Sequence, residues 1–251
     1  MTRPAVPLIP SAVVTTSWDD GHVLDIRLAE MLAARGIRGT FYIAPENTEL
    51  AAAERLGADG WRELAENFEI GGHTLSHRRL TTLSLADADA EIRTGKARLE
   101  EATGRPVSSF CYPGGRYREH HVTLLRQAGF HGARTVRRLS TGPVADPFAM
   151  RTTVQARPHV RDWPGVAALH GGRPVPSIRC MNWATLAVTL FDRVLAAGGV
   201  FHLWGHSWEI NSLRQWDRLT RVLDHIGNRP GVRYLANGEL LAGPGGSVRQ
   251  P

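Results

Sequence analysis

Short apolar segments alternate with amphipathic segments along most of the chain. The apolar segments predict buried strands, and segments with apolar residues at helical spacing predict helices. Strands are predicted at residues 12–16, 39–43, 69–71, 108–112, 133–136, 150–154, 200–204 and 232–235. Helices are predicted at residues 23–35, 61–67, 84–104, 120–128, 183–197 and 212–226. The region 137–181, rich in Pro, Gly and Arg, shows no pattern beyond the one strand.

The regular alternation of strands with helices predicts parallel βαβ units and therefore an α/β protein. We expect a closed barrel of the (β/α) kind, with an open doubly wound sheet as the alternative. No linker or internal repeat divides the chain. We therefore predict a single domain over residues 1–240, followed by a disordered tail over residues 241–251.

The amino-acid composition argues against nucleic acids and membranes as binding partners. The chain has 251 residues, of which 42% are hydrophobic and 22% charged, as in ordinary globular proteins. Its net charge of +6 comes from scattered arginines without a basic stripe, so no nucleic-acid partner is expected. No apolar stretch is long enough to span a membrane, and no secretory signal is evident. We expect a cytoplasmic protein, and the oligomeric state stays open.

Ionisable residues follow four of the predicted strands. Asp19 and Asp20 come after the first strand, and His73 and His77 after the third. A segment with a cysteine, a tyrosine and an arginine follows the fourth, and His206 follows a late strand. Functional residues of (β/α) barrels lie at the carboxyl ends of the strands. The sequence therefore predicts one site built from these four segments.

The two histidines suggest a metal site. His73 and His77 are four residues apart, so a helical turn would place both imidazoles on one face. Asp20 or Asp19 would supply an anionic third ligand, and the other carboxylate would then reach a water molecule. Incidental histidines and an ordinary acidic turn are the alternatives. Two histidines with one carboxylate also match the facial triad of non-heme Fe(II) oxygenases, but those enzymes are usually all-β.

Several motifs carry a family resemblance. Ser-Trp-Asp-Asp-Gly at residues 17–21 is similar to the Thr-Phe-Asp-Asp-Gly motif of the polysaccharide deacetylase family, which is also the NodB homology domain or carbohydrate esterase family 4. His-Thr-Leu-Ser-His at residues 73–77 resembles the family's His-Ser/Thr-x-x-His motif. Residues 110–115 lie where the family has Arg-x-Pro-Tyr-Gly, and His206 lies where it has Leu-x-His. Order and spacing agree over residues 10–240.

The resemblance implies a distorted or incomplete (β/α) barrel and a hydrolytic deacetylase. It implies a divalent metal, usually zinc with cobalt, nickel or iron as alternatives, bound by Asp20, His73 and His77. Metal-bound water would be the nucleophile, with Asp19 as the base and His206 as the acid. The expected substrate is a small molecule with an N-acetyl group on an amino sugar. A hydrolase of a cyclic ureide or imide and a non-catalytic carbohydrate-binding relative are the alternatives.

Further residues are expected around the substrate. The backbone N–H of Gly114, at the family's tyrosine position, would help to bind the oxyanion. The family's base-orienting arginine is replaced by Cys111, and Arg116 is the candidate to take over its task. Tyr112 and Trp208 are predicted to line the pocket, with core packing as the alternative for Tyr112.

Overall fold

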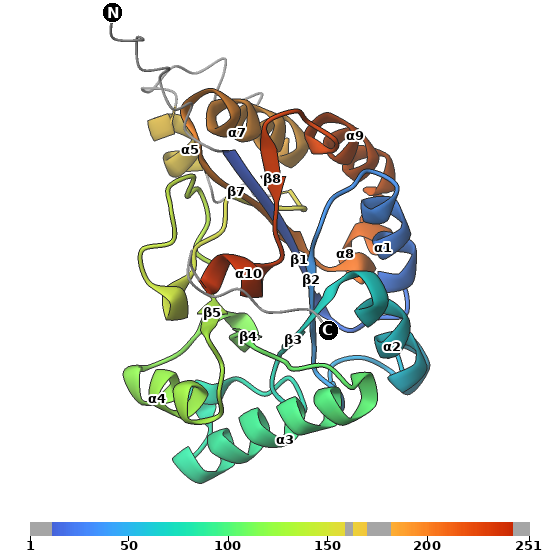
Figure 1. The fold of residues 1–251 in the computed structure, drawn as a ribbon, viewed down its shortest axis with the longest axis vertical. Coiled ribbons are helices and arrows are strands. Elements are labelled where there is room, and N and C mark those ends of the chain that lie inside the picture. Colours follow the sequence, from blue (N-terminus) through green and yellow to red (C-terminus); the bar gives the residue numbers. More distant parts are fainter. Residues whose placement is uncertain (1–11, 159–162, 170–181, 243–251) are drawn as a thin grey trace, which may run out of the picture.

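The computed structural model describes residues 12–158, 163–169 and 182–242. Its strands form one parallel sheet with the order β5-β4-β3-β2-β1-β7-β6, and β8 pairs with the first part of β1 (Figure 1). The strands are β1 (Ala12–Asp20), β2 (Thr40–Ile43), β3 (Glu69–Gly72), β4 (Ser109–Cys111), β5 (Gly132–Arg134), β6 (Val154–Gln155), β7 (Gly199–Gly205) and β8 (Val232–Tyr234). All the predicted strands are therefore present.

One segment brings the two edges of the sheet together. The backbone N–H of Met150 donates to the carbonyl of Ala133 in β5, and the N–H of Thr135 donates back to Met150. A few residues later, β6 pairs in parallel with β7. Residues 150–155 thus run from one edge strand to the other and curl the sheet into a distorted barrel. The predicted fold class is confirmed, and the open doubly wound sheet is wrong.

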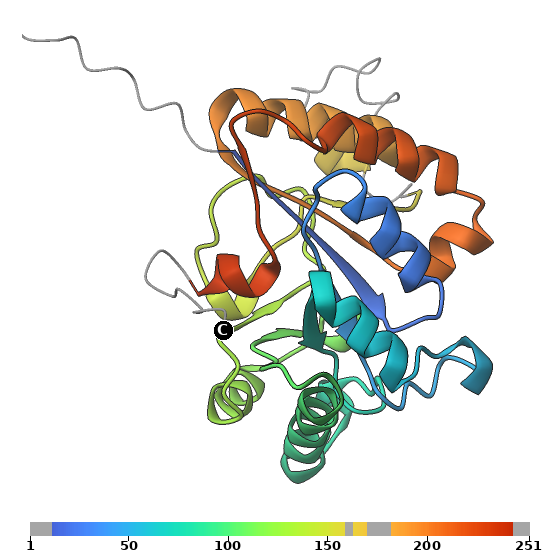
Figure 2. The same cartoon turned by 45° about the vertical axis from the view of Figure 1, so that its right-hand side comes forward.

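Helices cover the outside of the curled sheet (Figures 1 and 2). They are α1 (Asp25–Ala33), α2 (Ala58–Asn67), α3 (Leu85–Thr103), α4 (Glu119–Gln127), α5 (Trp163–Leu169), α7 (Trp183–Ala197), α8 (Ser207–Ser212), α9 (Trp216–Ile226) and α10 (Asn237–Leu241). Helix α7 packs on β7 and β1 and carries α9 on its side, whereas α3 packs on β3 and lies next to α4 (Figure 1). No helix of the described residues is long and apolar enough to cross a membrane.

Local sequence signals set the limits of several helices. Ser84 accepts a hydrogen bond from the N–H of Asp87 at 3.1 Å and caps α3, and Gly104 ends that helix at φ +66°. Asn182 caps α7 in the same way through the N–H of Ala184. The predicted helix over residues 212–226 is wrong at its start. The chain turns at Arg214, with φ +53°, and so separates α8 from α9.

Helix α10 closes the opposite side of the barrel from the predicted site. Asn237, its first residue, bonds Thr15 in β1 and the hydroxyl of Tyr42 in β2. Its backbone N–H donates to Thr40, the first residue of β2. Residue 241, where the tail was expected to begin, still belongs to α10, and residues 243–251 lie outside the described part of the chain.

Candidate active site

The side chains of Asp20, His73 and His77 converge at the carboxyl ends of β1 and β3. Asp20 Oδ1 lies 3.7 Å from His73 Nε2 and 3.3 Å from His77 Nε2. The three side chains offer ligand atoms that all lie within 4.8 Å of one another. Asp20 Oδ1 is buried and accepts no hydrogen bond. A buried carboxylate oxygen facing two imidazole nitrogens is a donor set that suits a divalent metal such as zinc.

The backbone and neighbouring groups aim these three side chains. The two histidines do not share a helical turn, as the sequence suggested. Instead the segment turns through positive φ at Thr74 (+63°) and His77 (+65°), and Asp20 itself has φ +89°. Such conformations cost free energy in non-glycine residues and concentrate at functional sites. The irregular backbone, rather than a helical turn, therefore brings the imidazoles of His73 and His77 to the same side.

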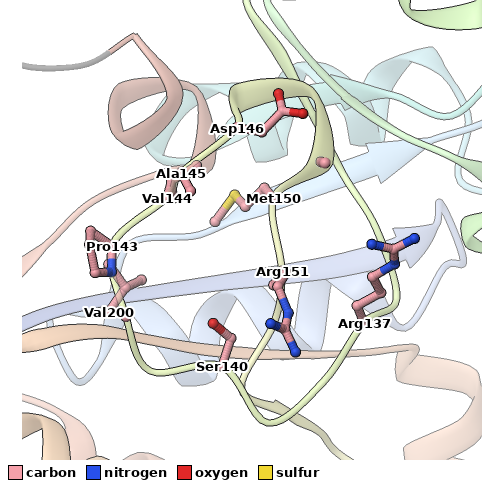
Figure 3. A pocket seen from close by; sticks show the side chains of 11 residues that line it. Arg137, Ser140, Pro143, Val144, Ala145, Asp146, Met150, Arg151 and Val200 are labelled. Carbon is pink, nitrogen blue, oxygen red and sulfur yellow. The ribbon is translucent and has the colours of Figure 1, made fainter. Parts of the chain in front are cut away.

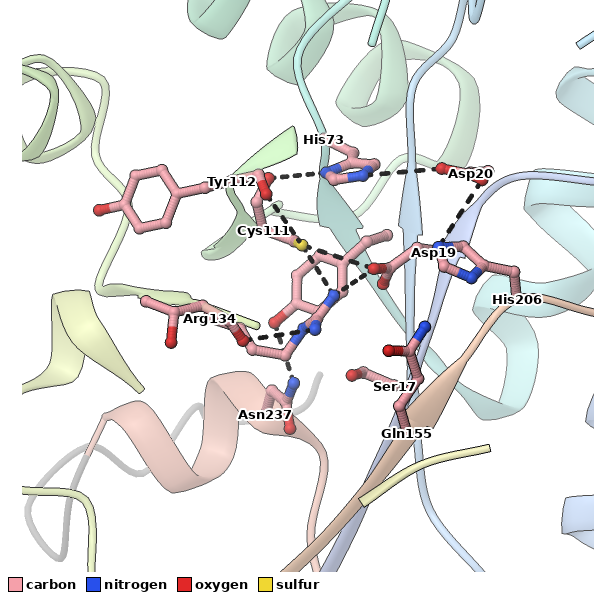
Figure 4. A network of polar contacts seen from close by, with 12 residues as sticks. Ser17, Asp19, Asp20, His73, Cys111, Tyr112, Arg134, Gln155, His206 and Asn237 are labelled. Carbon is pink, nitrogen blue, oxygen red and sulfur yellow. Dashed lines mark hydrogen bonds and ion pairs between the residues drawn. The ribbon is translucent and has the colours of Figure 1, made fainter. Parts of the chain in front are cut away.

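Hydrogen bonds fix which atom of each ligand faces the centre. His73 Nδ1 lies 2.7 Å from the carbonyl oxygen of Cys111, so Nδ1 donates its proton there and Nε2 keeps its lone pair (Figure 4). Burial and the nearby His77 lower the pKa of His73 to about 4, so His73 is neutral at pH 7. Trp208 Nε1 donates to Asp20 Oδ2 at 2.8 Å. Trp208, predicted to line the pocket, thus leaves Asp20 Oδ1 facing the histidines.

Asp19 lies in the barrel interior, beside this group. Its Oδ2 accepts a hydrogen bond from the guanidinium of Arg134, at the end of β5, and both side chains are buried. Burial alone would raise the pKa of Asp19, but the charge of Arg134, helped by His73 and His206, holds it below the usual value. Asp19 therefore stays ionised at neutral pH, whereas its Oδ1 lacks a hydrogen-bond donor.

Arg134 also explains how Asp19 is oriented although Cys111 stands where the family has its base-orienting arginine. Its Nη2 donates to Cys111 Sγ at 2.8 Å, so the arginine reaches Asp19 across the small thiol (Figure 4). Arg116, the candidate named from the sequence, is exposed, and no contact between it and Asp19 is found among the described residues. The correction follows from topology, because β5 lies next to β4. The sequence does contain one signal for this role, because Arg134 is a charged residue at the end of an otherwise apolar strand.

His206 follows β7 and approaches the same centre. Its Nε2 lies 3.9 Å from Asp20 Oδ2, and its Nδ1 lies 3.2 Å from Glu209 Oε2. Burial lowers the pKa of His206, but the hydrogen bond to Glu209 and the charges of Asp20 and Asp19 outweigh it and raise the pKa. Glu209 also pairs with Arg157 at 2.7 Å. From the sequence, Glu209 could pair with an arginine or bind substrate, and the structure shows the pair with Arg157; its contact with His206, the residue that precedes α8, was not predicted.

Two predicted substrate residues follow β4 and have different surroundings. Gly114 is exposed, with φ +63° in the turn Pro113–Gly115, a conformation that glycine adopts without strain. Tyr112 is fully buried, donates its hydroxyl to the carbonyl of Phe148 at 3.1 Å, and stacks on Tyr117. The substrate role predicted for Tyr112 is therefore wrong, because its side chain packs in the core.

Comparison with known proteins agrees with this geometry. A family model described as polysaccharide deacetylase matches residues 9–133, which include Asp19, Asp20, His73 and His77. The chain belongs to the polysaccharide deacetylase family. Among curated proteins, none matches the sequence.

Solved structures of the deacetylase family share the fold. A Mycobacterium smegmatis protein named as a polysaccharide deacetylase has a TM-score of 0.67 at 16% identity, covering 94% of this chain and 91% of the other. The chitin deacetylase from Colletotrichum lindemuthianum has a TM-score of 0.58 at 18% identity, covering 92% and 88%. The Streptococcus pyogenes deacetylase in complex with acetate has a TM-score of 0.51 at 16% identity. That match covers 55% of this chain and only 62% of the streptococcal one.

A second group of potential ligands lies deeper in this deacetylase barrel. Asp19, His73 and Cys111 also offer atoms within 4.8 Å of one another. The guanidinium of Arg134 already donates to both Asp19 and Cys111. A metal cation there would face this fixed positive charge, so the group with Asp20 and His77 is the better metal site.

A cavity of about 290 Å³ lies elsewhere in the molecule (Figure 3). Its described lining comes from the loop between β5 and β6 and from Val200, near the amino end of β7. The active-site residues instead follow the carboxyl ends of the strands. This cavity is therefore separate from the site.

Proposed function

We propose that this chain is a metal-dependent hydrolase that removes an N-acetyl or similar N-acyl group from an amino sugar or a sugar-containing small molecule. The observation that carries the proposal is the ionised Asp19, held by Arg134, beside the group of Asp20, His73 and His77. Because proteins of this fold include a pseudoenzyme, the argument rests on these side chains rather than on the fold. Carbohydrate binding without catalysis would require neither a buried base nor a histidine acid.

The donor set supports zinc as the metal. Asp20 Oδ1 is buried without a hydrogen-bond donor, and His73 Nε2 has its lone pair free because Nδ1 donates to Cys111. His77 Nε2 completes two nitrogens and one oxygen, which leaves room for further ligands. When bound, the metal would polarise the acyl carbonyl and make water more acidic.

Asp19 and His206 each carry out one of the two proton transfers of the reaction. Asp19 accepts the proton of the attacking water, and its low pKa keeps it ready to do so. His206 donates a proton to the leaving nitrogen, and its raised pKa keeps it protonated to higher pH. We assign the oxyanion to the backbone N–H of Gly114, which lies in an exposed turn three residues after Cys111, whose carbonyl orients His73. Glu209 positions His206 through Nδ1.

The nature of the scissile bond is tested by product release. Acetate is measured from N-acetylglucosamine, a small glycoside of it, a nucleotide sugar and insoluble chitin, with and without zinc. Zinc-dependent release from a small molecule supports the proposal, with Asp19→Asn as the matched inactive protein. Release from chitin alone would contradict the expected small substrate. Ring opening of a cyclic ureide without any acetate release would instead favour a ureide or imide hydrolase.

An oxygenase activity finds no support in the site. Non-heme Fe(II) oxygenases share the ligand types, but their usual scaffold is an all-β jelly roll rather than a curled parallel sheet with helices. If turnover required 2-oxoglutarate, an oxygenase would be favoured over a hydrolase. The cytoplasmic location and the single domain over residues 1–240 stay predictions.

A further inference from the structure

The arginines around the site differ in how they are paired. Arg134 contacts Asp19, and Arg157 contacts Glu209, so both are neutralised by carboxylates. Arg79, in the loop after β3, is exposed. Among the described residues, no carboxylate lies within 4.0 Å of its guanidinium. Among other exposed arginines of the described residues, Arg98 has a carboxylate partner and Arg105 has none, so Arg79 is distinguished by its position next to Gly114.

Arg79 lies against Gly114, at the part of the site where the acyl oxygen is expected. A Cβ atom added to Gly114 would be 3.3 Å from Arg79 Nε and 3.9 Å from Cζ. A side chain at position 114 would therefore crowd the arginine. The absence of a side chain allows a guanidinium to lie beside the backbone amide to which the proposed function assigns the oxyanion.

The backbone of Arg79 is fixed even though its side chain is exposed. Its carbonyl accepts hydrogen bonds from Thr82 N at 3.0 Å and from Thr82 Oγ1 at 2.8 Å. The next residue, Leu80, is fully buried and anchors the turn. The turn thus presents the guanidinium at the rim with little freedom in the main chain, which reduces the entropy lost when a ligand binds.

Neighbouring charges extend the positive character of this rim. Arg78 and Arg116 are exposed on the same two loops, and no ion pair is found for either among the described residues. Glu49, on the loop after β2, approaches His77 instead, with Oε2 3.2 Å from Nδ1. The side of the site near Gly114 is therefore cationic, whereas the side near His206 is neutralised by Glu209.

We propose that the substrate is anionic: an N-acylated amine that also carries a carboxylate or a phosphate group, which Arg79 binds beside Gly114. A guanidinium matches both oxyanions through paired N–H donors. The inference rests on the proposed function and specifies its substrate class. It also gives an unpaired arginine at the rim of the active site a role in specificity.

The test compares acylated amines that differ in charge. Probes are N-acetylglucosamine, its 1-phosphate, its 6-phosphate and N-acetylmuramic acid, assayed for acetate release by the zinc-loaded wild type. We expect kcat/KM to be at least tenfold higher for one anionic probe than for the neutral sugar. The phosphate and carboxylate probes distinguish the two sources of the anion. No preference for any anionic probe would overturn the proposal.

Variants then assign the preference to Arg79. In Arg79→Gln the ratio of anionic to neutral kcat/KM should fall about tenfold, mainly through KM, as expected for one lost charge-assisted hydrogen bond. Arg79→Lys should restore part of the ratio. Arg105→Gln, an exposed arginine before β4 at the other end of the barrel, should leave it unchanged. An equal loss on both kinds of probe would place Arg79 at the oxyanion and overturn the proposal.

Binding separates this inference from the activity. The preferred anionic probe is titrated calorimetrically into wild type and Arg79→Gln, both carrying Asp19→Asn to block turnover. Binding about tenfold weaker without Arg79 supports the anion site even if no probe is hydrolysed, in which case only the proposed function fails. Equal affinity in both proteins would overturn the anion site whatever the activity.

Discussion

The two ends of the barrel treat buried polar groups in opposite ways. At the amino end, Glu69 accepts hydrogen bonds from Thr40 Oγ1 at 2.6 Å and from Gly238 N at 2.8 Å, and Asn237 bonds Thr15 and Tyr42. At the carboxyl end, one oxygen of each neighbouring aspartate has no donor. Burying an unpaired carboxylate oxygen is costly, so the carboxyl end is poised for a ligand, whereas Glu69 and Asn237 at the amino end have partners within the protein.

The largest effect should come from removing a ligand at the carboxyl end. His77→Ala or Asp20→Asn should abolish both bound zinc and turnover, because two remaining ligands bind the metal too weakly. Metal content of the purified variants measures this directly. His225→Ala, on α9, is the control that should keep full occupancy. A zinc stoichiometry unchanged in His77→Ala would remove that residue from the site.

The next effect separates the two aspartates. Asp19→Asn should keep zinc but lose turnover by about 100-fold or more, because an amide cannot accept the proton from water. Metal content and acetate release, measured on the same preparation, test it against Asp20→Asn. The roles would be exchanged if Asp19→Asn lost its metal while Asp20→Asn retained it.

Stability should reveal how Arg134 and Asp19 depend on each other. Arg134→Leu leaves a buried carboxylate without its partner and should lower the free energy of unfolding by about 3–5 kcal/mol at pH 7. The double variant with Asp19→Asn should recover most of the loss. The low pKa of Asp19 means that the pair stabilises above pH about 4, and that its contribution fades as the pH falls through the pKa in the folded state.

Urea unfolding of the single and double variants at pH 7 and at lower pH measures this coupling. A purely additive cycle would show that the two charges act independently, in conflict with their contact.

A smaller effect is expected at the amino end. Asn237→Ala leaves Thr15 and the Tyr42 hydroxyl without a partner and should cost about 1–3 kcal/mol of stability. Its zinc content should be that of the wild type, because α10 lies at the other end of the strands. A variant that kept its stability but lost zinc would contradict the division between the two ends.

The smallest effect concerns the pH profile. The negative charge of Glu209 raises the pKa of His206, so Glu209→Gln should lower it and move the alkaline limb of kcat/KM to lower pH. Glu66→Gln, on the exposed face of α2, is the matched control and should not shift the profile. An unchanged alkaline limb would mean that His206 is not the acid.

The sequence alone determined the order of the strands and of the long helices, whereas the short helices α5, α8 and α10 were not predicted. Apolar periodicity and caps such as Ser84 and Asn182 act within a few residues, so they can be recognised without knowing the fold. The convergence of Asp20, His73 and His77 could also be predicted, since parallel strands bring their carboxyl ends to one edge.

Several contacts between distant residues depend on the closure of the barrel and could not be predicted from the sequence. Arg134 meets Asp19 from 115 residues away, because β5 curls opposite β1. Residues 150–155 join the edges, and Trp208 turns back onto Asp20. These partners carry no local signature, because their pairing depends on how far the sheet curls and on which inward-facing side chains then share the interior. Apolar periodicity predicts that a residue is buried. Which residues it then contacts depends on the tertiary structure.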